Sequence, residues 1–427
     1  MDRQPAFRLD PNTGFLADPK GQSVCRTLDD AGHQAYFVGG CVRNAIMGVA
    51  ASDVDIATDA TPEDVMRIAQ EAGLRAVPTG IDHGTVTIVI DGTPFEVTTF
   101  RRDVATDGRR AVVAFSTSID ADARRRDFTM NALYADRHGW VHDPVAGLAD
   151  AQARRVRFID DPVQRIREDY LRILRFFRFG AWYADPGHGW DAEALAAIAD
   201  TLDGLSTLSA ERVGAEMLKL LGAPDPAPAM AVMVRTGVLA ALLPGADARL
   251  LGPVVHLGGS VPLDPITRLA ALGGQDVAER LRLSRKQDKQ LEATLTLAGT
   301  TRGLRALGHI GGTEAAQGAA ILRAAISGTP LPDGWKGDIS EGTQATFPVS
   351  AADLPDLQGP ALGTRLKALK QDWLASDLTL TTATLLGGCP RAPPDVENFQ
   401  PKGGTHGSQD LERHLTLSHA VRCDAHA

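Results

Sequence analysis

A short apolar run that ends in two glycines constrains the fold of this 427-residue chain more than any other feature. Ala35–Val38 is typical of a strand, Gly39-Gly40 of a turn, and Cys41-Val42-Arg43 of the start of a short helix. Ten residues further on, Asp53-Val54-Asp55 opens an alternating polar and apolar run, 53–57, which predicts a second, half-buried strand. This succession predicts a mixed α/β region over about the first 145 residues.

The two aspartates, Asp53 and Asp55, are candidates for a metal site. Side chains at positions i and i+2 of a strand share one face, and two like charges so close together are unfavourable without a cation. Mg²⁺ prefers carboxylate and phosphate oxygens, and the two glycines let the backbone approach a phosphate. Arg43 adds a positive charge for the same phosphates. An isolated aspartate pair is usually a solvated strand edge; its combination with the glycine turn indicates a metal and nucleotide site.

The following segments predict a hairpin and a third acidic candidate. Thr85–Ile90 and Thr93–Phe100 are rich in β-forming residues and are joined by Asp91-Gly92, a strong turn signal. Glu96 lies on the second run and is our candidate to complete the acidic site, with an ordinary exposed strand carboxylate as the alternative. Residues 103–118 are polar and predict a loop.

The segment 124–178 contains arginine without lysine. It has twelve arginines and eight acidic residues, a local balance of +4 in a chain whose net charge is −9. Arginine is suited to bidentate recognition of phosphates and base edges. Near its start lies the motif RRDFTMNA, residues 125–132. The alternative interpretation of this motif is an ordinary helix start capped by Asp127 or Thr129.

The second motif of the segment is EDYLRILRFFRF, residues 168–179. Asp169, Arg172, Arg175 and Arg178 are spaced three apart and are expected to form a stripe on one helix. The residues between them are apolar, so the helix is expected to be buried and its arginines need partners. These partners are either Glu168 and Asp169, in an internal ion-pair network, or a triphosphate and a base.

An aspartate and an arginine one turn apart can read a base edge. The aspartate accepts from the amino group of cytosine or adenine, and the arginine donates to the neighbouring ring nitrogen. Guanine and uracil present the opposite order. Asp169 and Arg172 can therefore select C and A without a nucleic-acid template.

Beyond about residue 147 the chain is expected to be helical. Ser327–Thr346 is rich in glycine and proline and predicts a linker, and a short helical unit is expected over 351–386. Residues 388–427 are expected to be disordered. Their histidines and cysteines match no regular zinc spacing; the residues concerned are Cys389, His406, His414, His419, Cys423 and His426.

Other classes of protein are disfavoured. No run approaches the ~18 apolar residues of a membrane span, and the N-terminal residues show no apolar leader. The four cysteines are widely spaced, which fits a reducing cytoplasm better than a disulfide framework.

The glycine turn and aspartate pair resemble those of nucleotidyltransferases of the polymerase β superfamily. In chain order, GGCVRN with DVD, EVTTFRRD, RRDFTMNA and EDYLRILRFFRF resemble the class II tRNA nucleotidyltransferase and poly(A) polymerase family over about residues 33–387. The resemblance implies an α+β fold, with a polymerase β-like head containing a mixed sheet, followed by an all-α neck, body and tail. We expect a catalytic head at 20–147, a nucleotide-selecting neck at 148–222, an RNA-binding body at 223–330, a tRNA-binding tail at 331–387 and a disordered extension at 388–427.

The resemblance also implies an activity, namely template-independent addition of C and A nucleotides to the tRNA 3′ end. CTP and ATP would be the donors, pyrophosphate the leaving group, and the acceptor and T-stem region of tRNA the macromolecular partner. Asp53 and Asp55 would bind Mg²⁺, with Glu96 beside them. The implied nucleotide-binding residues are Gly39, Gly40, Arg43, Arg126, Asp169, Arg172, Arg175 and Arg178. Asn44 departs from the pattern, because the family more commonly has an aspartate there; it keeps the hydrogen-bonding shape and loses a charge.

Three alternatives stay open. A poly(A) polymerase is one, although such enzymes often carry a strongly basic C-terminal extension that this chain lacks. An enzyme that adds only CC or only A is the second. A catalytically dead RNA-binding protein is the third, and the intact Asp53, Asp55, Asp169 and Arg172 argue against it.

Overall fold

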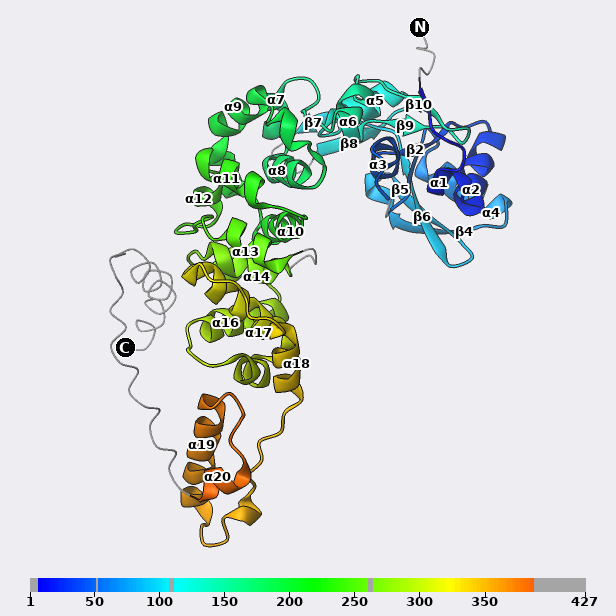
Figure 1. The fold of residues 1–427 in the computed structure, drawn as a ribbon. Coiled ribbons are helices and arrows are strands. Elements are labelled where there is room, and N and C mark those ends of the chain that lie inside the picture. Colours follow the sequence, from blue (N-terminus) through cyan, green and yellow to red (C-terminus); the bar gives the residue numbers. More distant parts are fainter. Residues whose placement is uncertain (1–6, 51–52, 107–110, 260–263, 388–427) are drawn as a thin grey trace, which may run out of the picture. The chain divides into compact units, whose positions relative to one another are not determined.

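The computed structural model describes residues 7–50, 53–106, 111–259 and 264–387, and the chain divides into two compact units, Met1–Leu208 and Ser209–Ala427 (Figure 1). The first unit contains a mixed sheet and several helices, and the described part of the second is helical. This confirms the predicted α+β fold class. The expected extension at 388–427 lies outside the described residues.

An eight-stranded sheet forms the centre of the first unit, in the order β1-β10-β9-β2-β3-β6-β5-β4. Its strands are β1 (Phe7–Arg8), β2 (Ala35–Val38), β3 (Asp55–Thr58), β4 (Arg75–Gly80), β5 (Thr85–Ile90), β6 (Thr93–Thr99), β9 (Tyr134–Ala135) and β10 (Trp140–His142). Only β3 and β6 pair in parallel, and the other neighbours are antiparallel. The predicted Asp91-Gly92 turn joins β5 and β6, and both residues have positive φ.

The register of four strands brings chemically important residues into one row. Val38 at the end of β2 pairs with Tyr134 of β9 on one side and with Asp55 of β3 on the other. Asp55 in turn pairs with Glu96 of β6. Side chains of directly paired residues lie on the same face of a sheet, so Tyr134, Val38, Asp55 and Glu96 share a face.

Short helices flank this sheet. They are α1 (Gly14–Ala17), α2 (Pro19–Asp30), α3 (Gly40–Ile46), α4 (Pro62–Glu71), α5 (Ile119–Arg124) and α6 (Leu148–Gln152). Thr61-Pro62-Glu63 predicts a helix start, with Thr61 as the cap and Pro62 in the first turn. The α4 helix begins there, and the Thr61 side chain accepts from the Asp64 backbone N–H. Val24, Phe37 and Ile56 are fully buried in the core beneath these elements.

The predicted loop at 103–118 is wrong for most of its length, because the chain forms a second, two-stranded sheet. Strand β7 (Arg101–Thr106) pairs with β8 (Ala111–Phe115) in an antiparallel hairpin. The polar composition of β7 obscured its pairing with the β-branched Val112 and Val113 of β8. The base of this hairpin is closed by a hydrogen bond from the Ser116 backbone N–H to the Phe100 carbonyl at 2.8 Å.

The rest of the first unit contains α7 (Pro162–Glu168), α8 (Leu171–Tyr183) and α9 (Ala192–Asp200). The single helix predicted to include Asp169 is interrupted there: α8 begins at Leu171, and Asp169 has an extended backbone between α7 and α8. Its carboxylate accepts the Leu171 N–H at 3.1 Å, which satisfies one free donor of the new helix. Phe176 and Phe177 of α8 pack against Trp190.

The described part of the second unit consists of helices. They are α10 (Ala210–Leu221), α11 (Ala227–Arg235), α12 (Val238–Leu242), α13 (Leu251–Gly258), α14 (Pro265–Leu272), α15 (Val277–Arg280), α16 (Arg285–Ala298), α17 (Leu304–Ser327), α18 (Trp335–Gln344), α19 (Gly359–Ala375) and α20 (Thr382–Leu386). The linker predicted at 327–346 is wrong, since α18 occupies its second half and buries Ile339 against α17. None of the helices in the described ranges is both long and apolar enough to cross a bilayer.

Two arginines hold helix ends in this unit. Arg268 of α14 is 2% exposed and donates to the carbonyls of Leu221, Ala223 and Pro224 at the end of α10. Arg323 of α17 donates to the carbonyls of Leu297 and Arg302 around the end of α16. Both side chains satisfy carbonyl groups that a helix terminus leaves without an internal partner.

Candidate functional site

The predicted acidic residues lie together at the start of β3 and on β6. Asp55 and Glu96 are direct neighbours across the two parallel strands. Burial and the charges of Glu96 and Asp53 raise the pKa of Asp55, while Arg126 opposes this rise. Asp53 precedes β3 rather than lying in it, so the same-face argument from strand alternation does not apply to it.

The donor set at this edge fits a hard divalent cation. Negative groups crowd around Asp55, which a cation would relieve. In the described ranges no three His, Cys, Asp or Glu side chains form a ready-made metal cluster. Mg²⁺ rarely needs one, because it commonly takes one or two carboxylates and completes its shell with water and substrate phosphates.

The glycine turn adjoins the acidic row. Val38 pairs with Asp55, and the chain turns immediately afterwards at Gly39, whose φ of 72° is in the left-handed region. A Cβ atom at Gly39 would lie 3.5 Å from Nη1 of Arg126. Glycine therefore provides both the turn and an open approach to that guanidinium.

Arg43 is held by neutral partners. Its Nε and Nη2 atoms donate to Oδ1 of Asn44 at 3.1 and 2.8 Å, and its Nη1 donates to Oδ1 of Asn131 at 2.5 Å. The guanidinium also lies over the Tyr183 ring, 4.0 Å from its centroid. The side chain is only 5% exposed, and burial lowers its pKa. Because its hydrogen-bond partners are amides, no carboxylate directly cancels its charge.

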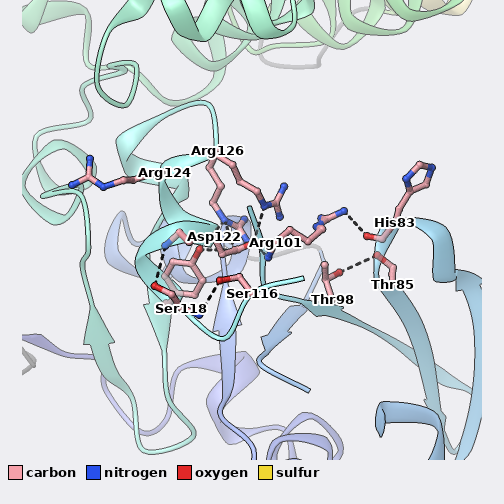
Figure 2. Close-up of polar contacts among 12 residues, drawn as sticks. His83, Thr85, Thr98, Arg101, Ser116, Ser118, Asp122, Arg124 and Arg126 are labelled. Carbon is pink, nitrogen blue, oxygen red and sulfur yellow. Dashed lines mark hydrogen bonds and ion pairs between the residues drawn. The ribbon is translucent and has the colours of Figure 1, made fainter. Parts of the chain in front are cut away.

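Arg126 is held by a carboxylate and a phenol. Its Nη2 and Nε donate to Oδ2 of Asp122 at 2.9 and 3.3 Å, and its Nε also donates to the Tyr134 hydroxyl at 3.0 Å. The Arg101 backbone N–H donates to the same carboxyl group at 3.2 Å. Figure 2 shows Asp122 between Arg126 and Arg101. The Arg101 guanidinium donates to the His83 carbonyl.

The rest of the RRDFTMNA motif joins the sheet to α8. Asp127 accepts from Asn131 Nδ2 at 3.0 Å and from Arg175 Nε at 2.6 Å. A continuous chain of hydrogen bonds therefore runs from Arg43 through Asn131 and Asp127 to Arg175. The expectation that Asp127 or Thr129 caps a helix is wrong, because the single turn at 129–131 has no side-chain cap.

The predicted base-reading residues lie next to each other at the start of α8. Arg172 donates to Glu168 at 2.5 Å and to the carbonyls of Arg165 and Arg125 at 2.9 and 3.0 Å. The ion-pair alternative is therefore present for Arg172, through Glu168, whereas Arg175 pairs with Asp127 instead. Arg178 lies over the Phe179 ring, 4.5 Å from its centroid.

Sequence reasoning missed Asp122, Tyr134, Asn131 and Tyr183. The spacing could have indicated Asp122, since it lies one helical turn before Arg126. Tyr183 gave no local signal, because Arg43, over which its ring lies, is distant in sequence. Tyr134 lies 8 positions from Arg126 and on a different element, so helix spacing could not indicate it.

Comparisons with known proteins agree with this geometry. The family model described as "Poly A polymerase head domain" matches residues 35–157, and one described as "Probable RNA and SrmB- binding site of polymerase A" matches residues 191–250. The crystal structure of the Bacillus stearothermophilus CCA-adding enzyme in complex with CTP is 30% identical with a TM-score of 0.68, and the alignment covers 84% of this chain and 94% of that one. The chain belongs to the CCA-adding enzyme and poly(A) polymerase family.

The relatives in this family align with different shares of the chain. The CCA-adding enzyme of Levilactobacillus brevis is 38% identical over 59% of this chain and 63% of its own length. The mitochondrial CCA tRNA nucleotidyltransferase 1 of Mus musculus is 42% identical over 47% of this chain and 46% of its own. The matches thus span about half to under two thirds of these curated relatives. A Thermotoga maritima CCA-adding enzyme complexed with tRNA, 17% identical with a TM-score of 0.63, shares the fold over 90% of this chain and 97% of that one.

Proposed function

We propose that this protein adds C and A nucleotides to the 3′ end of tRNA without a template, using CTP and ATP and releasing pyrophosphate. The observation that carries the proposal is the row in which Asp55 and Glu96 lie beside the Gly39-Gly40 turn, with Arg126 facing that turn. The family membership and the CTP complex of the Bacillus stearothermophilus relative support it.

Asp53 and Asp55 would hold Mg²⁺, with Glu96 beside them. The bound ion would supply Lewis-acid stabilisation of phosphate charge. The glycine turn, Gly39 and Gly40, would let the backbone approach the triphosphate. Most of the rate would come from positioning the tRNA 3′-hydroxyl against the α-phosphorus of the nucleotide.

The arginines would bind the nucleotide in two ways. Arg126 presents Nη1 beside the glycine turn, where it can meet a phosphate oxygen. Arg43 is buried and hydrogen-bonded to amides, and it would act on the phosphates mainly through its positive charge. Arg175 and Arg178 would lie further along the same nucleotide.

Asp169 and Arg172 would read the base edge by accepting from the exocyclic amino group and donating to the ring nitrogen. Glu168 and two backbone carbonyls already fix the Arg172 guanidinium. A fixed guanidinium loses little side-chain entropy when a base binds. This arrangement favours cytosine and adenine.

The remaining assignments follow from the family. We propose a catalytic head at 20–147, a nucleotide-selecting neck at 148–222, and a body and tail at 223–330 and 331–387 that bind the acceptor and T-stem region of tRNA. We also propose a cytoplasmic location, which the free, buried thiols of Cys25 and Cys41 support.

The test offers three tRNA transcripts, ending before CCA, after C and after CC, each with labelled CTP or ATP. Stepwise addition that stops after the terminal A supports the proposal. Long A tracts would identify a poly(A) polymerase instead, and an arrest after CC or a requirement for a CC end would identify a partial enzyme. Omission of Mg²⁺ is expected to abolish incorporation, and restoring it to recover the activity. Binding of tRNA without any incorporation would support the RNA-binding alternative.

A further inference from the structure

Two buried side chains outside the sequence motifs hold one edge of the Arg126 guanidinium. Asp122 lies on α5 and is 1% exposed, and Tyr134 lies on β9 and is fully buried. Their mutual contact closes a triangle, because the Tyr134 hydroxyl donates to Oδ2 of Asp122 at 2.7 Å while accepting from Nε of Arg126 at 3.0 Å. Nη2 of Arg126 completes it by donating to the same Oδ2 at 2.9 Å.

This triangle uses Nε and Nη2 of Arg126 and leaves Nη1 directed at the glycine turn. Nη1 lies 3.5 Å from the position that a Cβ atom on Gly39 would take. The Arg126 side chain keeps 20% of its surface exposed, against 1% for Asp122. The edge of the guanidinium that carries Nε and Nη2 is therefore anchored, while Nη1 faces the glycine turn.

The charges at this point favour an anion. Asp122 forms ion pairs with two guanidiniums, those of Arg125 and Arg126, at 2.8 and 2.9 Å. One carboxylate cancels only one of these two positive charges. Burial opposes ionisation of Asp122, but Arg126, Arg125 and the Tyr134 hydroxyl outweigh it and hold the pKa of that carboxyl well below its usual range. The carboxylate thus stays ionised at neutral pH.

Sheet register places the anchor close to the acidic row. Tyr134 pairs with Val38, and Val38 pairs with Asp55. Tyr134 is therefore two strand spacings, about 10 Å, from Asp55 on the same face. Arg126 is close enough to this row for its charge to oppose the rise in the pKa of Asp55.

We propose that Asp122 and Tyr134 are positioning residues that fix Nη1 of Arg126 for contact with the triphosphate of the incoming nucleotide. The proposal rests on the proposed function, and it assigns to these two side chains a role in nucleotide affinity through Arg126 alone. Because the triphosphate is common to both substrates, the contribution is the same for CTP and ATP.

The sharpest test is Tyr134→Phe, since it removes one hydroxyl and keeps the ring that packs beside Tyr36 and Phe100. Loss of this anchor is expected to raise KM for both CTP and ATP by about 3- to 10-fold, the effect of one lost hydrogen bond. Inhibition by inorganic tripolyphosphate is expected to weaken by the same factor. KM for tRNA is expected to stay within error of the wild type. The melting temperature is expected to fall, because two buried hydrogen bonds are lost, but the variant is expected to stay folded at the assay temperature.

Asp122 is tested by a conservative pair of variants. Asp122→Asn keeps the shape but places an amide where several donors converge, and it is expected to raise KM for both nucleotides more than Tyr134→Phe does. Asp122→Glu keeps the charge and is expected to recover part of the loss. Tyr36→Phe is the matched control, because the Tyr36 hydroxyl donates to Gln34 at 3.3 Å.

A double-mutant cycle with Arg126→Gln separates this inference from the proposed function. If Tyr134 acts through Arg126, Tyr134→Phe causes no further rise in KM in the Arg126→Gln background. A multiplicative loss in the double variant, or a change confined to one nucleotide, would overturn the positioning role while leaving nucleotide addition intact. A wild-type protein that adds no nucleotide would instead contradict the proposed function.

Discussion

Asp55 pairs directly with Glu96 across the parallel strands β3 and β6, and this is the only parallel pairing in the eight-stranded sheet as described. The pairing brings together two acidic residues that are 41 positions apart in the chain. The negative charge of Glu96 raises the pKa of Asp55. A site that concentrates negative charge in this way is suited to a cation.

The first prediction concerns this pair. Asp55→Asn is expected to lower kcat/KM for CTP and ATP by about 10²–10³, because the variant loses electrostatic stabilisation of the transition state. Glu96→Gln is expected to have a smaller effect in the same direction. Steady-state incorporation into a tRNA transcript ending before CCA measures both changes.

Asp91→Asn is the control for this experiment, since Asp91 is an exposed carboxylate in the turn of the same hairpin and has a positive φ that asparagine tolerates. Its incorporation rate is expected to match the wild type. An Asp55→Asn protein with unchanged activity would remove Asp55 from the metal site.

The second prediction concerns Asn44, which stands where the family more commonly has aspartate. Its Oδ1 accepts from Arg43, and its Nδ2 donates to the Ala50 carbonyl at 2.9 Å. Asn44→Asp keeps the first contact, loses the second and cancels the charge of Arg43. We expect KM for CTP and ATP to rise about 3- to 10-fold, with a smaller change in kcat.

Asn44→Ala helps to interpret that result. It removes both hydrogen bonds but adds no negative charge, so it separates the effect of charge from that of the lost contacts. If Asn44→Asp binds nucleotide as tightly as the wild type, charge at this position is irrelevant to the triphosphate.

The third prediction concerns stability of the helical unit. Arg268→Met is expected to lower the free energy of unfolding by about 2 kcal/mol or more, because it leaves buried carbonyls at the end of α10 without a donor. Chemical denaturation followed by circular dichroism measures the change. Arg249→Met is the control: the Arg249 side chain is 72% exposed in its ion pair, so a change of under about 1 kcal/mol is expected. Equal losses in both variants would contradict the role given to Arg268.

The fourth prediction is a pH dependence at Asp122. The groups facing this carboxyl are the guanidiniums of Arg126 and Arg125, the Tyr134 hydroxyl and the Arg101 backbone N–H. Its folded-state pKa lies below its unfolded value of about 3.9, so its contribution to stability is present above that value and is lost as pH falls towards the folded pKa. The free energy of unfolding of Asp122→Asn is therefore expected to fall below that of the wild type at pH 7, and the difference to narrow below about pH 4.

Urea titrations of both proteins between pH 7 and pH 3 measure this difference directly. Taking the difference between the two proteins removes the contribution of the other carboxyl groups. If the difference in free energy of unfolding between the two proteins stayed constant from pH 7 to pH 3, Asp122 would stabilise the fold by packing rather than by its charge.

The sequence predicted those parts of the site that depend on local pattern. The strand before Gly39, the hairpin at Asp91-Gly92 and the helix capped by Thr61 follow from turn and capping chemistry that acts over a few residues. The pairing of Asp55 with Glu96 was reachable as a hypothesis, because both were expected on neighbouring strands.

The parts that sequence reasoning missed depend on long-range packing. The interruption at Asp169 is invisible in a run of helix-forming residues, and the network around Asp127 joins residues up to 48 positions apart. The polar composition of residues 103–118 predicts a loop, although β7 and β8 pair there as a hairpin. Tertiary contacts override local propensity in such segments.

The segment Arg124-Arg125 joins α7 and α8 through its main-chain carbonyls, which act as hydrogen-bond acceptors. Arg165 donates to the Arg124 carbonyl at 2.7 Å, and Arg172 donates to the Arg125 carbonyl at 3.0 Å. Every amino acid carries a main-chain carbonyl, so changes of side chain at 124 and 125 leave these acceptors in place. The same tolerance does not extend to Arg165 and Arg172, whose replacement removes the donor. At residue 124 this join therefore tolerates a change of side chain, whereas a change at Arg165 or Arg172 breaks it from the other side.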